Sequence, residues 1–509
     1  MTHTRRELLG AATVAALWTH PARAAAPRAA ITVRVDRDFE VLDPAFRTGL
    51  QDGNTVRAIT QRLIGTGYNG AGLTLDAAES VTQTSPTTVD FVLKPGQMFS
   101  DGYGEMTADD VKFSYERFIL GQNGKESPYK GEWANLKSVD VTGKYTGTIT
   151  MERPRAGLFT IALGDVAGSV LSRRAVTERG IEHNTRPVGS GPMMVTSFEK
   201  QRQIVLRRNP AYAGPPSGFE EVTIRYVPDP RTTELGLRGT DIDFSALPPQ
   251  VAEPLRKIST LTVKDQPGIA NVWLGMNVEK PPFNDIRVRQ AIHLALDVDQ
   301  MLLAGYNGLA PRANAVIMKQ VVGYWPDAPV TKRDVAAAKK LLADAGHASG
   351  FRTRVTIQNQ PVYQTMALVA RAQLAEIGIT LEVDAQDGGS FFSSGKGDAG
   401  QKLELFMIRF NGKLDPNFLA QWFTTSQIGT WNWQRWSEPR FDALLDQASS
   451  ELDDTKRAAL FVDAQKLMHD SAAFVWLTYD VSVFAYHAWL TPALLPTGID
   501  WALDRFAPT

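Results

Sequence analysis

The 509-residue sequence contains no cysteine, and this absence excludes several kinds of chemistry. A chain without thiols has no disulfide, no thiolate metal site, no cysteine nucleophile and no lipid attached through an N-terminal cysteine. The formal net charge is only −1, so the chain as a whole has no basic character that would attract nucleic acid or an anionic membrane. We therefore expect no nucleic-acid partner.

The sequence motifs of common catalytic and cofactor sites are also missing. The chain has no P-loop, no G-x-S-x-G and no H-E-x-x-H. The segment GTGYNG at 65–70 fits G-x-G-x-x-G, but a helical pattern precedes it, whereas a dinucleotide-binding fingerprint follows a strand. The histidines beyond residue 24 are too far apart for a local metal motif. We expect no catalytic residue, no cofactor and no metal site.

The first 24 residues have the features of a cleaved export signal. Arg5 and Arg6 precede an apolar run from Leu8 to Trp18, and the small-residue site Ala22-Arg23-Ala24 follows. This pattern is typical of a twin-arginine leader, and a leader of the general secretion route is the alternative. No later stretch reaches the roughly 18 uninterrupted apolar residues that a membrane helix needs. We expect residues 1–24 to be removed and the mature chain to be exported and soluble.

Apolar spacing along the rest of the chain alternates between strand and helix periods. Strand patterns occur near 31–35, 88–93, 189–214 and 220–230, and helical patterns at 54–64, 108–118, 285–306 and 333–347. Thr107 and Asp110 form a capping box at one helix start, and Gly346 is a helix C-cap. This alternation predicts α/β lobes.

The segment TWNWQRWSEPRFDALL at 430–445 concentrates aromatic side chains, although the whole chain has only 11 tryptophans. Two interpretations remain open: the segment forms a wall of a ligand cleft, or it packs the helix that follows. Tryptophan suits a cleft wall because it buries a large area and keeps an N–H donor. We expect Trp436 to pack in the core. Trp431 and Trp433 alternate, so we expect them to face one side and Asn432 the other.

Eight segments, in order along the chain, resemble those of one protein family. They are VLDPAF (41–46), SDGYGEMTADDVKFSYERF (100–118), RPVGSGPMMV (186–195), RRNPAYAG (207–214), GMNVEKPPFNDIRVRQAIHLALD (275–297), AAAKKLLADAG (336–346), LDPNFLAQWF (414–423) and WNWQRWSEPRFDALLDQA (431–448). The sequence thus resembles the extracytoplasmic solute-binding proteins of ABC importers, in the peptide/nickel/opine-binding family (family 5). The resemblance covers nearly all of the chain after the leader.

The resemblance implies an α/β fold of the periplasmic-binding-protein (Venus flytrap) type, with two lobes and an inserted third domain. Lobe I would be discontinuous and comprise 25–68, 186–268 and 476–509. The inserted domain II would be 69–185, and lobe II (domain III) 269–475. Two chain crossings, near 270–277 and 476–481, would permit a hinge between the lobes.

The resemblance also implies which residues meet the ligand. Candidates by matched position are Thr48, Gly49 and Leu50 after the LDP turn, Tyr129 in the inserted domain, Trp273 and Asn277 beside the hinge, Arg409, Phe410 and Asn411 on a strand at the cleft floor, and Trp431, Asn432 and Trp433. No catalytic or metal-binding residue is implied. The expected partners are a peptide-like or other small solute and the ABC permease subunits at the inner membrane, for a monomeric periplasmic protein that is not an enzyme.

One departure from the family concerns the ligand. Peptide-binding relatives usually carry an aspartate shortly before the DP-NFL turn, which pairs with the ligand's ammonium. This chain reads MIRFNGKLDPNFL, with Asn411 or Gly412 at that place and Arg409 and Lys413 beside it. The segment QNQPVYQTMA (358–367) also lacks the arginine with which dipeptide binders often hold the ligand carboxylate. An ammonium without a carboxylate partner would be costly in a closed cleft.

The hypothesis is therefore that the ligand is not a plain zwitterionic dipeptide. A longer or modified peptide, an opine-like conjugate or another polar anion met by Arg409 remains open, as does a metal chelate. An exported hydrolase that acts on a similar substrate is the alternative from another functional class. That alternative requires a nucleophile which the sequence does not reveal.

Overall fold

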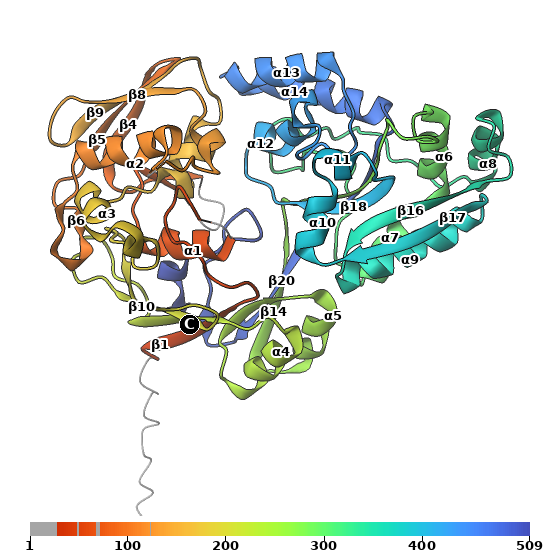
Figure 1. Ribbon diagram of the computed structural model, residues 1–509. Helices are drawn as coiled ribbons and strands as arrows, with labels where there is room; N and C mark the ends of the chain where they lie inside the picture. The colour runs from red at the N-terminus through yellow and green to blue at the C-terminus, as the bar shows by residue number, and fades with distance from the viewer. Residues whose placement is uncertain (1–27, 48–49, 68–71, 123) are drawn as a thin grey trace, which may run out of the picture.

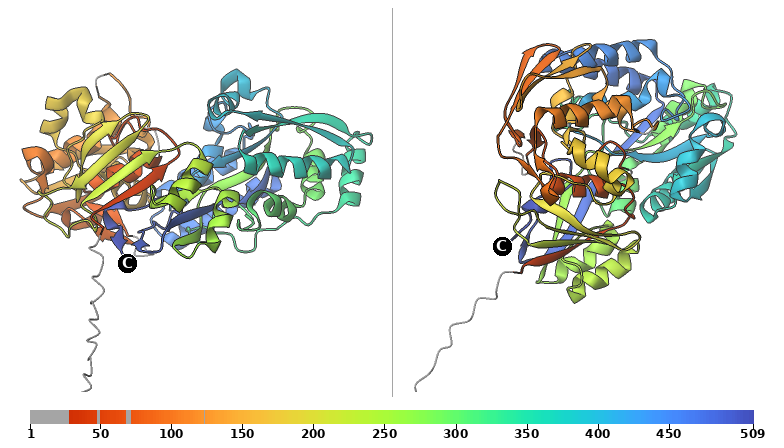
Figure 2. Two further views of the ribbon diagram at one scale, coloured as in Figure 1. Left: turned by 90° about the horizontal axis from the view of Figure 1, so that it is seen from below. Right: turned by 60° about the vertical axis from the view of Figure 1, so that its left-hand side comes forward.

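The structure is a computed structural model that describes residues 28–47, 50–67, 72–122 and 124–509 (Figure 1). The predicted leader at 1–24 lies outside the described residues, as do Thr48 and Gly49. Helices and strands alternate along the described chain, and three larger sheets organise it into a two-lobed α/β protein with an additional region. Figure 2 shows the two main lobes lying side by side along the long axis of the molecule.

The first lobe is built on a sheet that collects strands from both ends of the chain. β1 is parallel to its two neighbours β12 and β13, and β20 lies between β13 and β14 and is antiparallel to both. Ile31, Val33 and Val35 of β1 are buried together with apolar residues of α1, as their spacing predicts. In spatial order the strands are β10 (Met193–Glu199), β11 (Gln203–Arg208), β12 (Glu221–Tyr226), β1 (Ala30–Val35), β13 (Phe244–Leu247), β20 (Val481–His487) and β14 (Leu261–Pro267).

Helices cover both faces of this sheet because its central strands are apolar on both sides. In β20, Phe484 packs in the cluster that contains α1, whereas Val483 and Ala485 pack in the cluster that contains α4 and α5. The helices are α1 (Leu50–Ile59), α4 (Pro230–Gly239) and α5 (Pro249–Ala252), and a short pair, β21 (Leu490–Thr491) with β22 (Ala507–Pro508), lies near the C-terminus.

The additional region is a four-stranded antiparallel sheet packed on one helix. The predicted capping box starts this helix, α2, since the Thr107 amide donates to Asp110 Oδ2 at 2.9 Å. Tyr115 and Phe118 of α2 are buried with Phe91 of the sheet. The sheet order is β4 (Ala78–Ser85), β5 (Thr88–Leu93), β9 (Thr146–Met151) and β8 (Leu136–Val141). The region also contains α2 (Ala108–Leu120), α3 (Arg173–Arg179) and the pairs β2 (Ile64–Thr66) with β3 (Leu73–Leu75) and β6 (Met98–Phe99) with β7 (Gly104–Glu105).

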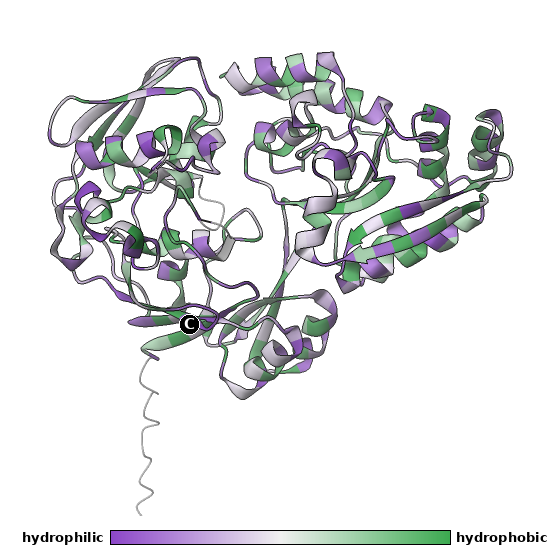
Figure 3. Cartoon of the chain, viewed as in Figure 1, coloured by the Kyte–Doolittle hydropathy of each residue, from purple (hydrophilic) through white to green (hydrophobic). Residues whose placement is uncertain are grey.

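The second lobe has a five-stranded mixed sheet with a different hydrophobic cluster on each face. One face packs on α6, α7, α8 and α9, and the other packs on a cluster rich in aromatic residues that includes α13 and α14. Figure 3 shows that apolar and polar residues alternate along many of these strands and helices. The strands, in spatial order, are β17 (Ile379–Gln386), β16 (Phe351–Gln358), β18 (Leu405–Phe410), β15 (Asn271–Met276) and β19 (Phe474–Thr478).

The helices of this lobe correct one prediction. The pattern at 285–306 predicts one helix, but the structure has two, because Leu296 is extended and Asp297 caps a new helix by accepting from the Gln300 amide at 3.0 Å. Gly346 follows α8 with a positive φ, as predicted for a C-cap. The helices are α6 (Ile286–Ala295), α7 (Val298–Tyr306), α8 (Val335–Asp344), α9 (Pro361–Ala375), α10 (Gly388–Ser394), α11 (Gly397–Gly400), α12 (Pro416–Ala420), α13 (Pro439–Ser450) and α14 (Asp454–Asp470).

Two short connections join the sheets of the two lobes. Residues 268–270 lead from β14 into β15, and residues 479–480 lead from β19 into β20. The connections lie side by side, because the Gly268 amide donates to the Asp480 carbonyl at 3.2 Å. Asp480 has a φ of +66°, a left-handed conformation at the point where the chain changes sheets.

Candidate functional site

A cavity of about 570 Å³ lies between the two lobes. Asp36 and Arg37 follow β1, Gln358 ends β16, and Arg409 lies near the end of β18. These strands each run parallel to a neighbour, so both sheets direct the carboxyl ends of parallel strands at the cavity. That edge is where open α/β sheets bind ligands. We call this cavity the interlobe pocket.

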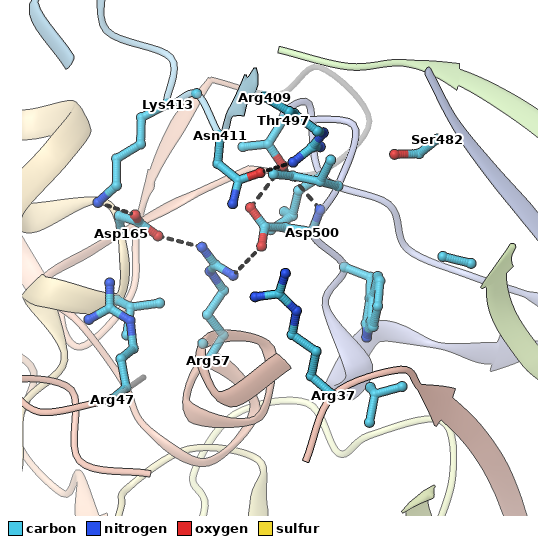
Figure 4. Close-up of a pocket in the computed structure, with 18 of the residues that line it drawn as sticks. Arg37, Arg47, Arg57, Asp165, Arg409, Asn411, Lys413, Ser482, Thr497 and Asp500 are labelled. Atoms are coloured by element: carbon cyan, nitrogen blue, oxygen red, sulfur yellow. Dashed lines mark hydrogen bonds and ion pairs between the residues drawn. The ribbon is translucent and has the colours of Figure 1, made fainter. Parts of the chain in front are cut away.

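Ion pairs cross one end of the interlobe pocket (Figure 4). Arg57 of α1 lies between two carboxylates, at 2.5 Å from Asp165 and 3.1 Å from Asp500. Lys413, in the loop after β18 of lobe II, reaches the opposite side and lies 2.8 Å from Asp165 and 2.6 Å from Glu132. The carboxylates therefore bind cations from both sides of the pocket.

Arg47 extends this network along the pocket wall. Its guanidinium lies 3.4 Å from Glu132 and donates to the Pro44 carbonyl at 2.6 Å. The guanidinium also stacks 3.9 Å from the ring centre of Tyr129, a cation–π contact. Burial raises the pKa of the Tyr129 hydroxyl, so Tyr129 presents a neutral phenol to the pocket.

The network keeps its members charged although they are buried. Burial alone would raise the pKa of Asp165, but Lys413 and Arg57 outweigh it and hold that pKa well below its usual range. Burial likewise acts to lower the pKa of Lys413, and Asp165 and Glu132 overcome this and raise it. Each buried charge thus depends on its partners, and removing one would leave the others uncompensated.

Arg409 connects the pocket to the crossing between the lobes. Its guanidinium donates to the Asp480 carboxylate and to the side-chain oxygen of Asn411. Burial acts to lower the pKa of Arg409, and Asp480 overcomes this and raises it. A solute that contacts Arg409 therefore contacts a side chain that is bonded directly to the chain crossing.

Two arginines on the lobe I wall differ in how their charges are compensated. Arg34 is buried and donates to the carbonyls of Val227, Pro228 and Ala246 at 2.7–3.2 Å. Burial lowers the pKa of Arg34, while nearby Asp36 opposes this effect. Arg37 is exposed at the pocket and forms no ion pair or hydrogen bond with another described residue. Arg37 is therefore available to an anionic group of a solute.

The additional region also contacts lobe II beside the pocket. The Ala156 amide donates to the Ser449 carbonyl of α13 at 3.0 Å, and Arg153 pairs with Asp446 at 2.6 Å. The Thr160 hydroxyl lies 3.4 Å from Asp415 at the start of α12. The pocket is therefore bounded by the additional region as well as by the two lobes.

Three of the residues predicted to bind ligand line this pocket, namely Tyr129, Arg409 and Asn411. Leu50 begins α1 near the pocket, and its side chain is outside the described residues, as are Thr48 and Gly49. Arg409 and Asn411 are two positions apart at the end of β18, so their side chains extend toward the same side. Phe410, between them, extends away and packs edge-on against Trp273 at 4.9 Å.

The structure corrects the prediction for Trp273 and Asn277. Trp273 is fully buried in the aromatic core of lobe II, since it lies on the face of β15 that points away from the pocket. Asn277 is also buried, and its amide group donates to the Leu403 carbonyl at 2.9 Å. Both residues stabilise the lobe next to the crossing and do not line the pocket.

The prediction for Trp431, Asn432 and Trp433 is also corrected, because this segment is a turn rather than an alternating strand. Trp433 is 1% exposed and packs against Phe391 and Phe406. Asn432 is buried and donates to the carbonyls of Phe423, Thr424 and Trp436 at 2.7–3.1 Å. Trp431 is half-buried against Phe410 and Trp422, outside the pocket lining.

Trp436 packs in the core, as predicted, with its ring 5.0 Å from that of Phe441. The polar pocket residues that the sequence prediction missed are widely dispersed and include Arg34, Asp36, Arg37, Arg47, Arg57, Glu132, Asp165, Gln358, Gln360, Tyr363, Ser482, Thr497 and Asp500. The position of Asp36 and Arg37, directly after a strand with two parallel neighbours, is a signal that would have indicated those two residues.

In the part of the chain that the structure describes, no group of three or more acidic, histidine or cysteine side chains is arranged to hold a metal ion. No described helix combines the length and the apolar composition that crossing a bilayer requires.

Comparison with known proteins assigns the chain to a family. The model of the bacterial extracellular solute-binding proteins, family 5 (middle region), matches residues 72–430, which is most of the chain. A probable D,D-dipeptide-binding periplasmic protein of Escherichia coli is 27% identical over 473 residues, covering 90% of this chain and 89% of its own. A glutathione-binding protein of Pectobacterium atrosepticum is 26% identical and covers 96% of each chain.

A solved structure agrees with this assignment. The ABC transporter-associated periplasmic binding protein of Helicobacter pylori, in complex with the peptide STSA, is 25% identical, with a TM-score of 0.82 over 95% of this chain and 98% of that one. The chain therefore belongs to the family 5 solute-binding proteins, which bind solutes for ABC importers.

Proposed function

We propose that this family 5 binding protein captures a peptide-like or related polar solute in the interlobe pocket and delivers it unchanged to the permease of an ABC importer. The observation that supports this proposal is the pocket itself, which both lobes line at the carboxyl ends of parallel strands. Relatives named for D,D-dipeptide and glutathione binding, and the STSA complex, make a peptide-like solute the favoured class. On this proposal the protein is not an enzyme.

The proposed mechanism is closure of the two lobes around the solute. The proposed units are lobe I (25–68, 186–268 and 476–509), domain II (69–185) and lobe II (269–475). The connections at 268–270 and 479–480 would absorb the rotation while each lobe keeps its packing. A solute that contacts both walls shifts the equilibrium toward the closed form, because only that form provides both sets of contacts. Tyr129, Arg409 and Asn411 are the proposed contacts, and Thr48, Gly49 and Leu50 are proposed from the family resemblance.

The proposed solute is not a plain zwitterionic dipeptide. Asn411 occupies the pocket end of β18, and the nearest charged neighbours on that segment, Arg409 and Lys413, are cations. A modified or longer peptide, an opine-like conjugate or another polar anion fits this wall better than a free ammonium does. A metal chelate remains a second candidate only if its metal is held by carboxylates, which Arg409 would bind.

Export is a separate part of the proposal. We expect cleavage of the leader at or near Ala25, and a monomeric periplasmic protein. Mass spectrometry of the exported protein should give a mature chain that begins there, and an intact leader would contradict the prediction. The twin-arginine route is proposed from Arg5 and Arg6, and replacing both by lysine should block export.

The decisive test of the solute-binding proposal combines native mass spectrometry with small-angle scattering. The mass of a co-purifying solute would identify the ligand, and adding it to stripped protein should reduce the radius of gyration. Calorimetry should give one solute per chain, with no chemical change after long incubation. Unchanged dimensions with a tightly bound solute, or turnover of the solute, would contradict the proposal and favour an exported hydrolase.

A further inference from the structure

The ammonium group of Lys413 lies between two carboxylates at the pocket, which is an arrangement that could also bind the ammonium group of a solute. Its ammonium is between the carboxylates of Glu132 and Asp165, at 2.6 Å and 2.8 Å. Its side chain is 15% exposed, and that of Glu132 is 7% exposed, so this contact is largely shielded from water.

The other carboxylates at the pocket are also next to protein cations. Asp165 and Asp500 share Arg57. Asp36 is exposed and forms no ion pair with a described residue, and its charge only opposes the lowering of the Arg34 pKa that burial causes. A solute ammonium beside Asp165 or Asp500 would have to displace Arg57 from a carboxylate whose charge it compensates.

On the cation side the balance is different, because Arg37 is exposed at the pocket without an ion pair to any described residue. The pocket thus offers a solute at least one uncommitted positive charge, whereas the carboxylates of Glu132, Asp165 and Asp500 already have partners. Since an ionised group that enters a shielded site needs an opposite charge, this arrangement favours carboxylates over ammonium groups.

We propose that Lys413 is a specificity-determining residue that serves as a built-in ammonium group, so that the pocket selects solutes with carboxylate or neutral polar groups and excludes those with a free ammonium at this position. This inference rests on the proposed solute-binding function and defines the class of solute. Lys413 also joins lobe II to the opposite wall, because Glu132 and Asp165 belong to the region with the four-stranded sheet. If Lys413 only holds the walls together, removing it should change the affinity for all solutes equally. If its charge selects the solute, removing it should change the affinities for charged and uncharged solutes differently.

The test compares two probes that differ only in the ammonium group, the tripeptide Ala-Ala-Glu and its N-acetyl derivative. Calorimetry should show that wild-type protein binds the N-acetyl probe at least about tenfold more tightly than the free tripeptide. In Lys413→Met, Glu132 and Asp165 each lose one of their two cations, and the ratio of the two affinities should shift toward the free tripeptide by at least about tenfold. Lys413→Arg should keep the wild-type preference.

Two further variants make the test decisive. Lys466→Met removes a lysine that is about half-exposed and pairs with Asp463 on α14, and it should change neither affinity. The charge-balanced variant Lys413→Met with Asp165→Asn should fold even if the single variant does not, and it should bind both probes within about threefold of each other.

The outcomes separate the inference from the function on which it rests. Equal binding of both probes by wild-type protein overturns the inference and leaves solute binding intact. A parallel loss of affinity for both probes in Lys413→Met also overturns it, because it shows that the lysine only holds the walls together. Failure of every variant to bind either probe overturns the inference and contradicts the proposed peptide-like class. If Lys413→Met gains affinity for the free tripeptide and not for the N-acetyl probe, the result supports the inference even where wild-type binding is weak.

Discussion

The aromatic cluster of lobe II and the charged network of the interlobe pocket differ in how the chain builds them. The aromatic cluster contains Trp273, Phe423, Trp433, Trp436 and Phe474, and several of its members are close together in the sequence. The charged network takes single residues from positions that are hundreds of residues apart, such as Arg57, Asp165, Lys413 and Asp500. The cluster that is conspicuous in the sequence is the core, and the dispersed network lines the interlobe pocket.

This difference shows what each kind of interaction requires. Aromatic side chains stabilise a lobe by burying area, and neighbours in sequence can share one buried volume. A pocket between two lobes must combine residues from both, so its members are necessarily distant in the chain. Charges suit this task because an ion pair acts between two walls without continuous packing, although each charge needs a partner when it is shielded from water.

The largest effect is expected where the aromatic cluster is broken. Trp433→Ala should lower the free energy of unfolding by about 3–5 kcal/mol, measured by chemical denaturation. The ring is 1% exposed, and Gly395 lies so near that a Cβ there would come within 1.9 Å of it. Trp431→Ala, at a half-buried tryptophan, is the matched control and should lower the free energy of unfolding by less. If Trp433→Ala loses solute affinity without losing stability, Trp433 contacts the solute and does not stabilise the core.

A smaller loss is expected where the charged network is broken. Arg57→Met should lower the free energy of unfolding by about 3 kcal/mol, because Asp165 and Asp500 then lose the cation that they share. Arg57→Lys keeps the charge and should retain most of the stability. Thermal and chemical unfolding of the three proteins would measure this. Unchanged stability in Arg57→Met would mean that the carboxylates are compensated without Arg57.

Acidification should give the smallest effect and should distinguish the two lobes. Burial lowers the pKa of His293, in the helical layer of lobe II, to about 4, so its stabilising share is complete above the unfolded value near 6.5 and is lost as the pH falls toward 4. Burial raises the pKa of Asp504, in lobe I, to about 6, so its share is complete below the unfolded value near 3.8 and is lost as the pH rises through 6.

The two groups therefore act in opposite directions between pH 6.5 and pH 4. His293→Gln should reduce the loss of stability on going from pH 7 to pH 5 by about 1–2 kcal/mol, and Asp504→Asn should increase that loss. Denaturation at pH 7 and pH 5 would measure both. Parallel pH profiles for wild-type protein and His293→Gln would show that this histidine titrates normally.

Local patterns predicted the elements well and their interruptions poorly. The capping box at Thr107 and the C-cap at Gly346 are read from neighbouring residues, and both are present. The break at Leu296 was missed because its apolar periodicity continues across Asp297, and only the cap contact ends one helix and starts the next. Likewise, the apparent alternation at Trp431 and Trp433 does not reveal a turn held by three hydrogen bonds from Asn432.

The site was predictable only where the family resemblance matched a position, as for Tyr129 and for two residues at a strand end. Arg409 and Asn411 occupy such places and line the pocket. Trp273 lies on the neighbouring strand but on the opposite face, and sequence position alone does not distinguish the two faces. The ion pairs of Arg57 and Lys413 depend on how lobe II is placed against the other units, which no local pattern specifies.

The place of β20 in the first sheet determines when that sheet is completed during synthesis. β14 has β20 as its sheet neighbour, and β20 consists of residues 481–487, more than two hundred residues later. The sheet of lobe II ends with β19 at residue 478, so its strands are all available first. The N-terminal strand β1 is therefore made first but belongs to the last of the three larger sheets to close. The edges of β13 and β14 that pair with β20 stay unpaired in the nascent chain until its final thirty or so residues emerge.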